Sequence, residues 1–234
     1  MTETKSGKLI VIEGTDASGK ETQTELLRQK LLRDNIQAQS ISFPRYETPT
    51  GKIVGICYLG KALPKNEVGC SWFAKPTELD PLTASLYYAA DRREAAPQIL
   101  KILNSGIHLI SNRYVESNMG HQGGKIRDES HRKRLFEKLD CLEHEILEIP
   151  RPNAVVFLYM PWKVTKELNK ERGGHQDAHE ASEEHLINAE EAYLQLSRLR
   201  KWERIDCAPH GFPPHSINEI SAEVYDRVKP LLEK

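Results

Sequence analysis

The sequence predicts an α/β fold in three layers, in which a five-stranded, mostly parallel sheet lies between two layers of helices. Short apolar runs alternate along the chain with longer stretches in which apolar residues recur at helical spacing. Such an alternation is typical of parallel strands in a sheet that helices cover on both faces. The 234 residues, 38% of them hydrophobic, suffice for one sizeable core. We therefore expect a single domain over residues 1–234.

The first strand is expected at residues 8–13, and it continues through a glycine-containing loop into a helix at 21–33. Further strands are expected where short apolar runs stand beside turn residues. They lie at 37–43, 107–111, 153–159 and 202–207. The remaining helices are expected at 49–59, 81–104, 129–147, 162–172, 182–201 and 216–232. Segments 61–80 and 173–180 fit neither pattern and are expected to be loops over the functional site.

Composition excludes several classes of protein. The 33 basic and 34 acidic residues nearly cancel, so no global field favours nucleic acid or an anionic membrane as a partner. The longest apolar runs fall far short of the roughly 20 residues that span a bilayer, and no apolar segment follows the polar first residues as in a secretory signal. The 4 cysteines form no C-x-x-C pair. We expect a cytoplasmic protein with reduced thiols that acts on small molecules.

Residues 14–20 satisfy the pattern G-x-x-x-x-G-K between an apolar strand and a helix, which is the context of a phosphate-binding loop. Glycines permit close backbone approach, the helix N-terminus faces the anion, and Lys20 supplies a charge for the β and γ phosphates. A glycine-containing turn with an exposed lysine is the alternative, which this context disfavours. The loop predicts a fold of the P-loop NTPase type that binds ATP. The expected ATP contacts are Gly14, Thr15, Ala17, Ser18, Gly19, Lys20, Glu21 and Thr22.

One position of the loop departs from the motif. The Ser or Thr whose hydroxyl would meet Mg²⁺ is replaced by Glu21, and Thr22 follows one place later. A carboxylate at this position can bind the metal directly or through water. It can also simply interact with the N-terminus of the helix, where negative charge is favourable. The sequence leaves both interpretations open.

Five blocks of the chain occur in the order seen in thymidylate kinases. Residues 11–23 read V-I-E-G-T-D-A-S-G-K-E-T-Q, which resembles the family's typical F-E-G-x-D-G-S-G-K-T-T-Q. The other blocks are 43–45 (F-P-R), 86–92 (L-Y-Y-A-A-D-R), 112–114 (N-R-Y) with 117–123, and 171–173 (E-R-G). The resemblance implies transfer of the ATP γ-phosphate to dTMP with Mg²⁺. It also implies a homodimer and a short mobile lid at about residues 172–181.

The resemblance also implies which residues hold the acceptor nucleotide. Arg45 would grip its phosphate in a bidentate contact, and Arg113 would bridge the donor and acceptor phosphates. Tyr88 and Arg92 lie four residues apart on one helix face and would hold the thymine, while the amide of Gln122 would read the pyrimidine edge. Without the resemblance, aromatic residues such as Tyr88 are more often core. The expected dTMP contacts are Asp16, Phe43, Arg45, Tyr88, Arg92, Arg113, Ser117, Asn118 and Gln122.

The third block departs from the family at its first residue, because Asn112 stands where thymidylate kinases have an aspartate near the phosphates and metal. An amide can hold a water molecule but contributes no charge to a cation. Glu21 gains a carboxylate beside the loop while Asn112 loses one. We therefore expect the charge that binds the metal to have moved to Glu21, with Asn112 acting through water.

The lid carries few cations. Arg172 precedes it, and no further Arg or Lys appears until Arg198. The positive charge for transfer is expected from Arg172 alone, or from His175 or His179 when protonated. Flexible-loop histidines without Cys partners are seldom metal ligands, so a metal site here is disfavoured. The expected catalytic residues are Lys20, Arg45, Arg113, Asp16 and Arg172; for Asp16, a turn-stabilising role is the alternative.

Two other functions remain open. The chain can be a kinase for another deoxynucleoside monophosphate, since neighbours of Gln122 can re-aim its amide. It can also be a nucleotide-binding regulatory protein that has lost catalysis, given the departures at Glu21 and Asn112. Retention of the acceptor arginines favours the kinase, because a triphosphate sensor has no need of them.

Overall fold

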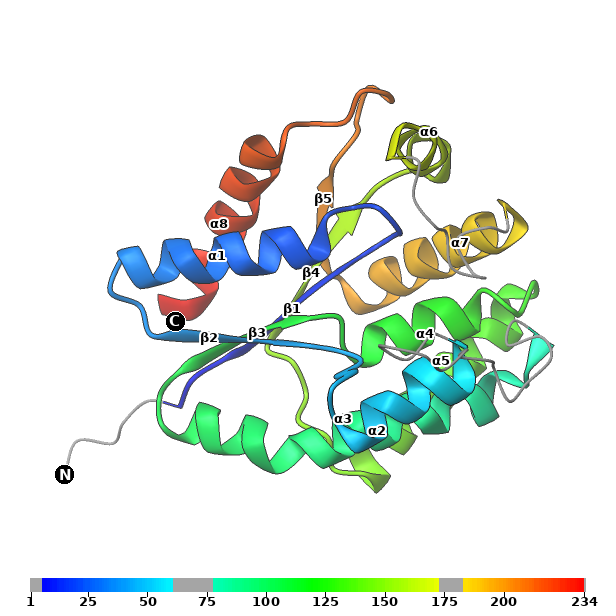
Figure 1. Cartoon of the computed structure of the whole chain (residues 1–234), viewed down its shortest axis with the longest axis horizontal. Coiled ribbons are helices and arrows are strands. Elements are labelled where there is room, and N and C mark those ends of the chain that lie inside the picture. Colours follow the sequence, from blue (N-terminus) through cyan, green and yellow to red (C-terminus); the bar gives the residue numbers. More distant parts are fainter. Residues whose placement is uncertain (1–5, 61–77, 173–182, 234) are drawn as a thin grey trace, which may run out of the picture.

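The computed structural model describes residues 6–60, 78–172 and 183–233 (Figure 1). Its centre is a five-stranded sheet with the order β2-β3-β1-β4-β5, in which every neighbouring pair is parallel. The strands are β1 (Leu9–Gly14), β2 (Ala38–Ser42), β3 (His108–Asn112), β4 (Ala154–Tyr159) and β5 (Glu203–Asp206). All five strands expected from the sequence are confirmed, and their ends agree to within one residue.

Helices fill the connections between the strands. They are α1 (Lys20–Arg33), α2 (Pro49–Lys52), η1 (Ile53–Tyr58), α3 (Pro81–Asn104), α4 (Val115–Gly123), α5 (Glu129–Asp140), η3 (Cys141–Ile146), α6 (Trp162–Arg172), α7 (Glu183–Arg200) and α8 (Ile217–Glu233). The bounds of α3 and α6 are those expected. The helices expected at 49–59 and 129–147 each widen into a π-helical turn, η1 and η3, which apolar periodicity does not distinguish from an α-helix.

Two hydrophobic clusters cover the two faces of the sheet. Because side chains alternate along a strand, Leu9 and Val11 join one cluster, while Ile10 and Ile12 join the other. The first cluster contains residues of α3, α4, α5 and α7, and the second contains residues of α1 and α8. Figure 1 shows α1 and α8 on one side of the sheet and α3, α4, α5 and α7 on the other. The predicted three-layer α/β fold is confirmed.

The parallel order brings three loops to one edge of the sheet. Asn112 at the end of β3 pairs with Ile12 of β1 and with Ser42 of β2. The phosphate-binding loop after β1, the block 43–45 after β2 and Arg113 after β3 therefore leave the sheet side by side. This carboxyl edge is where α/β sheets present ligand sites.

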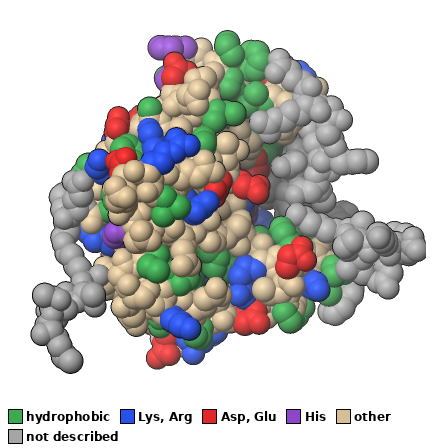
Figure 2. Space-filling view, turned by 60° about the vertical axis from the view of Figure 1, so that its left-hand side comes forward, with side chains coloured by type: hydrophobic (Ala, Val, Ile, Leu, Met, Phe, Trp, Pro, Cys, Tyr) green, Lys and Arg blue, Asp and Glu red, His purple; other side chains and the backbone are tan. Residues whose placement is uncertain are grey.

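The surface carries both signs of charge. Figure 2 shows acidic and basic side chains interspersed over the face that it presents. Among the described residues, no helix is long and apolar enough to cross a membrane.

Candidate active site

The phosphate-binding loop starts where β1 meets β4. A Cβ atom on Gly14 would lie 2.5 Å from the Leu158 carbonyl oxygen and 2.4 Å from Ser18 Oγ, so only glycine fits there. The loop then passes through positive φ values at Ala17 (57°) and Gly19 (80°). Gly19 caps α1 without a side chain, which leaves the first N–H groups of the helix for an anion.

Lys20 lies over this loop as the motif predicts. Its buried ammonium donates to the carbonyl oxygens of Gly14 (3.0 Å) and Thr15 (2.8 Å). The Thr15 hydroxyl donates to the Met160 carbonyl (2.7 Å) and accepts from the Met160 N–H (2.8 Å), which ties the loop to the end of β4. Glu21 and Thr22 follow in the first turn of α1 with exposed side chains.

Arg113 lies between the phosphate-binding loop and α4. It leaves β3 with a positive φ of 63°. Its Nη2 lies 3.6 Å from Asp16 Oδ1, and its Nη1 lies 3.3 Å from Ser117 Oγ and 3.9 Å from Glu13 Oε1. The guanidinium is thus held by carboxylates on the loop side; its role as a bridge between two phosphates stays a prediction.

Glu13 is a buried carboxylate to which the sequence interpretation gave no role. It is fully shielded from solvent and accepts hydrogen bonds from the Gly14 N–H (2.9 Å), the Ser117 hydroxyl (2.6 Å) and the Tyr193 hydroxyl (3.3 Å). It therefore ties the loop to α4 and α7 beside Arg113. The signal in the sequence is an acidic residue inside an otherwise apolar strand, directly before the loop.

A cavity of about 110 Å³ opens between the end of β2, α3 and α4. Eight of the nine residues expected to bind dTMP line it, which places them together as predicted. Its lining consists of Asp16, Phe43, Pro44, Tyr46, Leu59, Tyr88, Arg92, Arg113, Tyr114, Ser117, Asn118, His121 and Gln122. The Tyr88 ring stands edge-on to Tyr58 with centroids 5.6 Å apart, and Phe43 packs on Tyr114 at the same separation.

Arg92 enters the cavity from α3 with a fixed orientation. Its Nε and Nη2 donate to the two carboxylate oxygens of Glu143 at 2.5 and 2.6 Å, and its Nη1 donates to the Tyr114 carbonyl at 3.3 Å. Asn118 Nδ2 donates to the same carboxylate at 3.1 Å. Within the described structure, Asn118 Oδ1 and Gln122 Oε1 are buried acceptors without a hydrogen-bond donor, so the cavity offers acceptors to a base edge.

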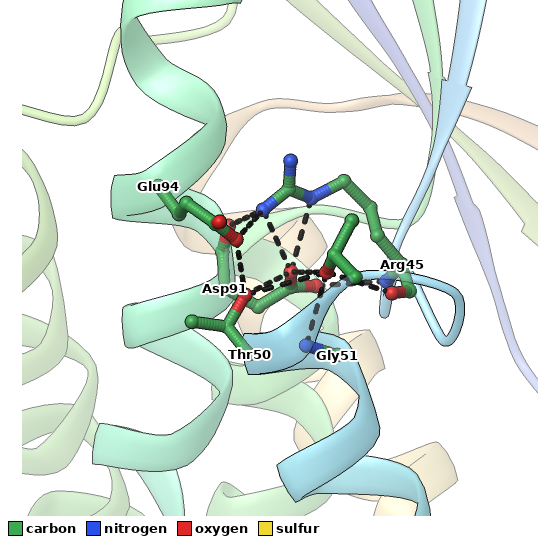
Figure 3. Close-up of polar contacts among 6 residues, drawn as sticks. Arg45, Thr50, Gly51, Asp91 and Glu94 are labelled. Atoms are coloured by element: carbon green, nitrogen blue, oxygen red, sulfur yellow. Dashed lines mark hydrogen bonds and ion pairs between the residues drawn. The ribbon is translucent and has the colours of Figure 1, made fainter.

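Arg45 is the expected acceptor residue that does not line the cavity. Its guanidinium is turned toward α3, where it donates to Asp91 and Glu94 (Figure 3). The sequence interpretation missed both carboxylates, because they lie 46 and 49 residues further along the chain. The phosphate contact of Arg45 stays a prediction.

The polar atoms near the loop fit a metal held through water. Asn112 Nδ2 donates to Ser42 Oγ at 2.8 Å, while its buried Oδ1 has no donor in the described part of the chain. The described residues contain no group of three His, Cys, Asp or Glu side chains that can hold a metal ion. Mg²⁺ commonly keeps several waters and takes one or two protein ligands plus phosphates, so this arrangement suits it. The roles of Glu21 and Asn112 stay predictions.

The lid residues expected to supply charge lie outside the described residues. Arg172 ends α6, but the placement of its side chain is not described, and His175 and His179 fall in the segment 173–182. α6 itself is tied to the loop, since the Thr165 hydroxyl donates to the Asp16 carbonyl at 2.9 Å.

Comparison with known proteins points to one family. The family model of thymidylate kinase matches residues 12–209. The human thymidylate kinase is 27% identical over 156 residues, which are 67% of this chain but only 62% of the human protein. The enzyme of Danio rerio is 24% identical over 95% of this chain and 90% of its own length. That of Halothermothrix orenii is 27% identical over 97% and 99%.

A solved structure agrees with this assignment. The thymidylate kinase of Candida albicans superposes with a TM-score of 0.70 and 23% identity, covering 96% of this chain and 92% of that one. This likeness shows a shared fold. The phosphate-binding loop, the cavity beside it and the family match over most of the sequence agree, and the chain therefore belongs to the thymidylate kinase family.

Proposed function

We propose that this protein is a dTMP kinase, which transfers the γ-phosphoryl group of ATP to the phosphate of dTMP and yields ADP and dTDP. The observation that carries the proposal is the cavity lined by eight expected acceptor residues, which shares Asp16 and Arg113 with the surroundings of the phosphate-binding loop. The phosphate-binding loop for the donor and the cavity for the acceptor meet at Arg113. This arrangement suits the transfer of a phosphoryl group between two nucleotides.

Phosphoryl transfer asks the protein mainly for alignment and charge neutralisation. The acceptor phosphate oxygen is already a nucleophile, so no side chain has to act as a base. In our proposal Lys20 neutralises the β and γ phosphates of the donor, and Arg113 meets the transferring group from the acceptor side. Glu13 holds Arg113 and Ser117 in place through its buried contacts.

We also propose a place for the donor base. A depression of about 380 Å³ lies between α6 and the segment after β5, with Trp162, Lys166 and Phe212 in its lining. The α6 wall is attached to the phosphate-binding loop, since the Thr165 hydroxyl donates to the Asp16 carbonyl at 2.9 Å. The segment after β5 leads into α8, whose first residue accepts a hydrogen bond from Gln23 Nε2 at its carbonyl (3.0 Å). An aromatic and cationic lining suits a purine ring.

In the same proposal Mg²⁺ binds with the phosphates, held by Glu21 and, through water, by Asn112 Oδ1. When bound, the ion supplies positive charge that neutralises the phosphate oxygens.

Arg172, or protonated His175 or His179, supplies the remaining charge from a lid at about residues 172–181 of a single domain. If a histidine is the cation, turnover falls as pH rises through about 6.5; a profile flat from pH 6 to 8 excludes it.

A homodimer through α3 is part of the proposal. Leu82, Leu86 and Leu100 are 40%, 50% and 45% exposed, and their spacing along α3 places them on one face of the helix. Such apolar exposure is typical of an interface. Light scattering gives the mass directly: a monomer at micromolar concentration contradicts this part. We further propose a cytoplasmic location and no nucleic-acid partner, from the balanced charge and the free thiols of Cys141 and Cys207.

The test is an assay of ADP release with Mg²⁺ and dTMP, dUMP, dCMP or dGMP as acceptor. We expect dTMP to give the highest kcat/KM. Arg113→Met should abolish turnover, while the control Arg204→Met, at an exposed pair with Asp206 that is not part of the cavity lining, should not. Preference for another monophosphate supports the alternative kinase, and the Candida albicans relative is itself described as having broad substrate specificity. Binding of ATP without any product supports the regulatory protein instead.

A further inference from the structure

Arg45 is held on α3 by two carboxylates, away from the cavity (Figure 3). Its Nε donates to Asp91 Oδ1 at 3.0 Å, and its Nη2 donates to Glu94 Oε2 at 2.6 Å and to the Asp91 carbonyl oxygen at 2.8 Å. The backbone N–H of Arg45 also donates to Asp91 Oδ2 at 2.8 Å. The side chain and the backbone of Arg45 are therefore both attached to the helix.

These bonds occupy most of the N–H donors of the guanidinium. An arginine has five N–H donors, and the bonds to Asp91 and Glu94 occupy the one on Nε and both on Nη2. In Figure 3 the remaining terminal nitrogen has no partner among the residues drawn. A bidentate grip on phosphate needs two neighbouring nitrogens. Arg45 can therefore grip a phosphate in this way only after it gives up a bond to α3.

The two carboxylates are not equivalent. The Asp91 side chain is 1% exposed and also accepts hydrogen bonds from the hydroxyls of Thr50 (3.0 Å) and Thr48 (3.3 Å). The Glu94 side chain is 44% exposed, and it shares the single hydrogen of the Thr50 hydroxyl with Asp91. An ion pair open to water is weak and screened by salt. Glu94 is thus the partner that Arg45 can exchange, while Asp91 is the permanent anchor.

We propose that Glu94 competes with the acceptor phosphate for Arg45 and so sets the affinity of the enzyme for its acceptor nucleotide, while Asp91 positions the arginine. The inference rests on the proposed function, in which Arg45 binds the acceptor phosphate. Neither carboxylate lines the cavity, so Glu94 acts on the substrate only through Arg45. Removing its charge should free the guanidinium and tighten binding.

The test compares KM for dTMP, KM for ATP and kcat in five variants, one of them a double variant. Glu94→Gln should lower KM for dTMP about two- to fivefold, the factor of one exposed ion pair, and leave KM for ATP unchanged. Asp91→Asn should raise KM for dTMP, because Arg45 loses its anchor. The control Glu148→Gln removes another exposed carboxylate, which pairs with the neighbouring Arg93 at 3.8 Å, and should change neither constant. In Arg45→Ala, the further change Glu94→Gln should have no effect.

Salt gives a second readout, since screening weakens the competing pair. The ratio of dTMP dissociation constants between wild type and Glu94→Gln should approach one as ionic strength rises. An unchanged or raised KM for dTMP in Glu94→Gln overturns the inference, as does an effect that persists in Arg45→Ala. If wild type neither binds nor phosphorylates dTMP, the proposed function fails instead, and the two failures are distinguishable.

Discussion

Arg92 and Glu143 form a bidentate ion pair that is closed to solvent, with the arginine 2% and the glutamate 0% exposed. The carboxylate belongs to η3 and also accepts from Asn118 Nδ2. It therefore joins α3, α4 and η3 behind the cavity. Burial lowers the pKa of the Arg92 guanidinium, but the attraction of Glu143 outweighs burial and the pKa is raised, so Arg92 stays charged. A fixed, desolvated arginine offers a base edge a donor that needs no reorganisation on binding.

Glu143→Gln should lower the free energy of unfolding by about 3–5 kcal/mol, because it leaves a buried guanidinium without its counter-charge. Urea denaturation of both proteins measures the difference. The control Glu148→Gln, at a 78% exposed position, should change stability by less than about 0.5 kcal/mol. A loss below about 1 kcal/mol for Glu143→Gln would mean that the pair contributes little to the fold.

Gly120→Ala should destabilise the fold by about 1–3 kcal/mol through overpacking. A Cβ atom there would lie 2.4 Å from Tyr193 Cζ. The Tyr193 ring cannot move aside easily, because it is fully buried and stacks on Phe157 with centroids 5.7 Å apart. The matched control is Gly55→Ala, whose Cβ would lie 2.9 Å from Cδ1 of Tyr46, a ring that is 37% exposed and therefore less enclosed than that of Tyr193. Equal losses in the two variants would contradict the argument.

The elements and the place of the site could be predicted from the sequence because both depend on local patterns. Apolar runs located the strands, and the loop at 14–20 with Arg113 marked their carboxyl edge. The partners of the arginines could not be predicted. Glu143 lies 51 residues from Arg92, and Asp91 lies 46 residues from Arg45. These pairs depend on how α3 packs against its neighbours. The sequence pattern of a single helix carries no information about that packing.

Glu116 should make stability depend on pH. Burial, followed by repulsion from Glu13 and Glu143, raises the pKa of its carboxyl to about 8, and its Oε2 has no donor within the described structure. Between the unfolded pKa near 4.5 and about 8, the folded state binds the extra proton, so stability falls as pH rises, by up to about 1.4 kcal/mol per pH unit.

Glu116→Gln removes this titration and should therefore become progressively more stable than wild type from pH 5 to pH 8. Denaturant unfolding at a series of pH values measures the difference. Glu137→Gln, at a 63% exposed position, is the control and should follow the wild-type curve. A difference between Glu116→Gln and wild type that does not grow with pH would show that Glu116 is ionised in the folded protein at pH 5.

In our proposal, Glu21 supplies the negative charge that binds the metal. Its exposed carboxylate stands in the first turn of α1, directly after Lys20. The neutral Asn112, at the end of β3, donates a hydrogen bond to Ser42 of the neighbouring strand β2. If Glu21 carries the metal, Glu21→Gln should raise the Mg²⁺ concentration for half-maximal turnover, because a neutral amide attracts a hard cation less than a carboxylate does. Glu21→Thr restores the hydroxyl of the motif next to the lysine and should recover part of that loss. Turnover titrated with Mg²⁺ at saturating nucleotides measures both.

The control is Glu25→Gln, one helical turn further along α1, where the carboxylate binds Arg28, and it should leave the titration unchanged. A Glu21→Gln titration that coincides with wild type would leave Glu21 as a residue that only favours the helix N-terminus.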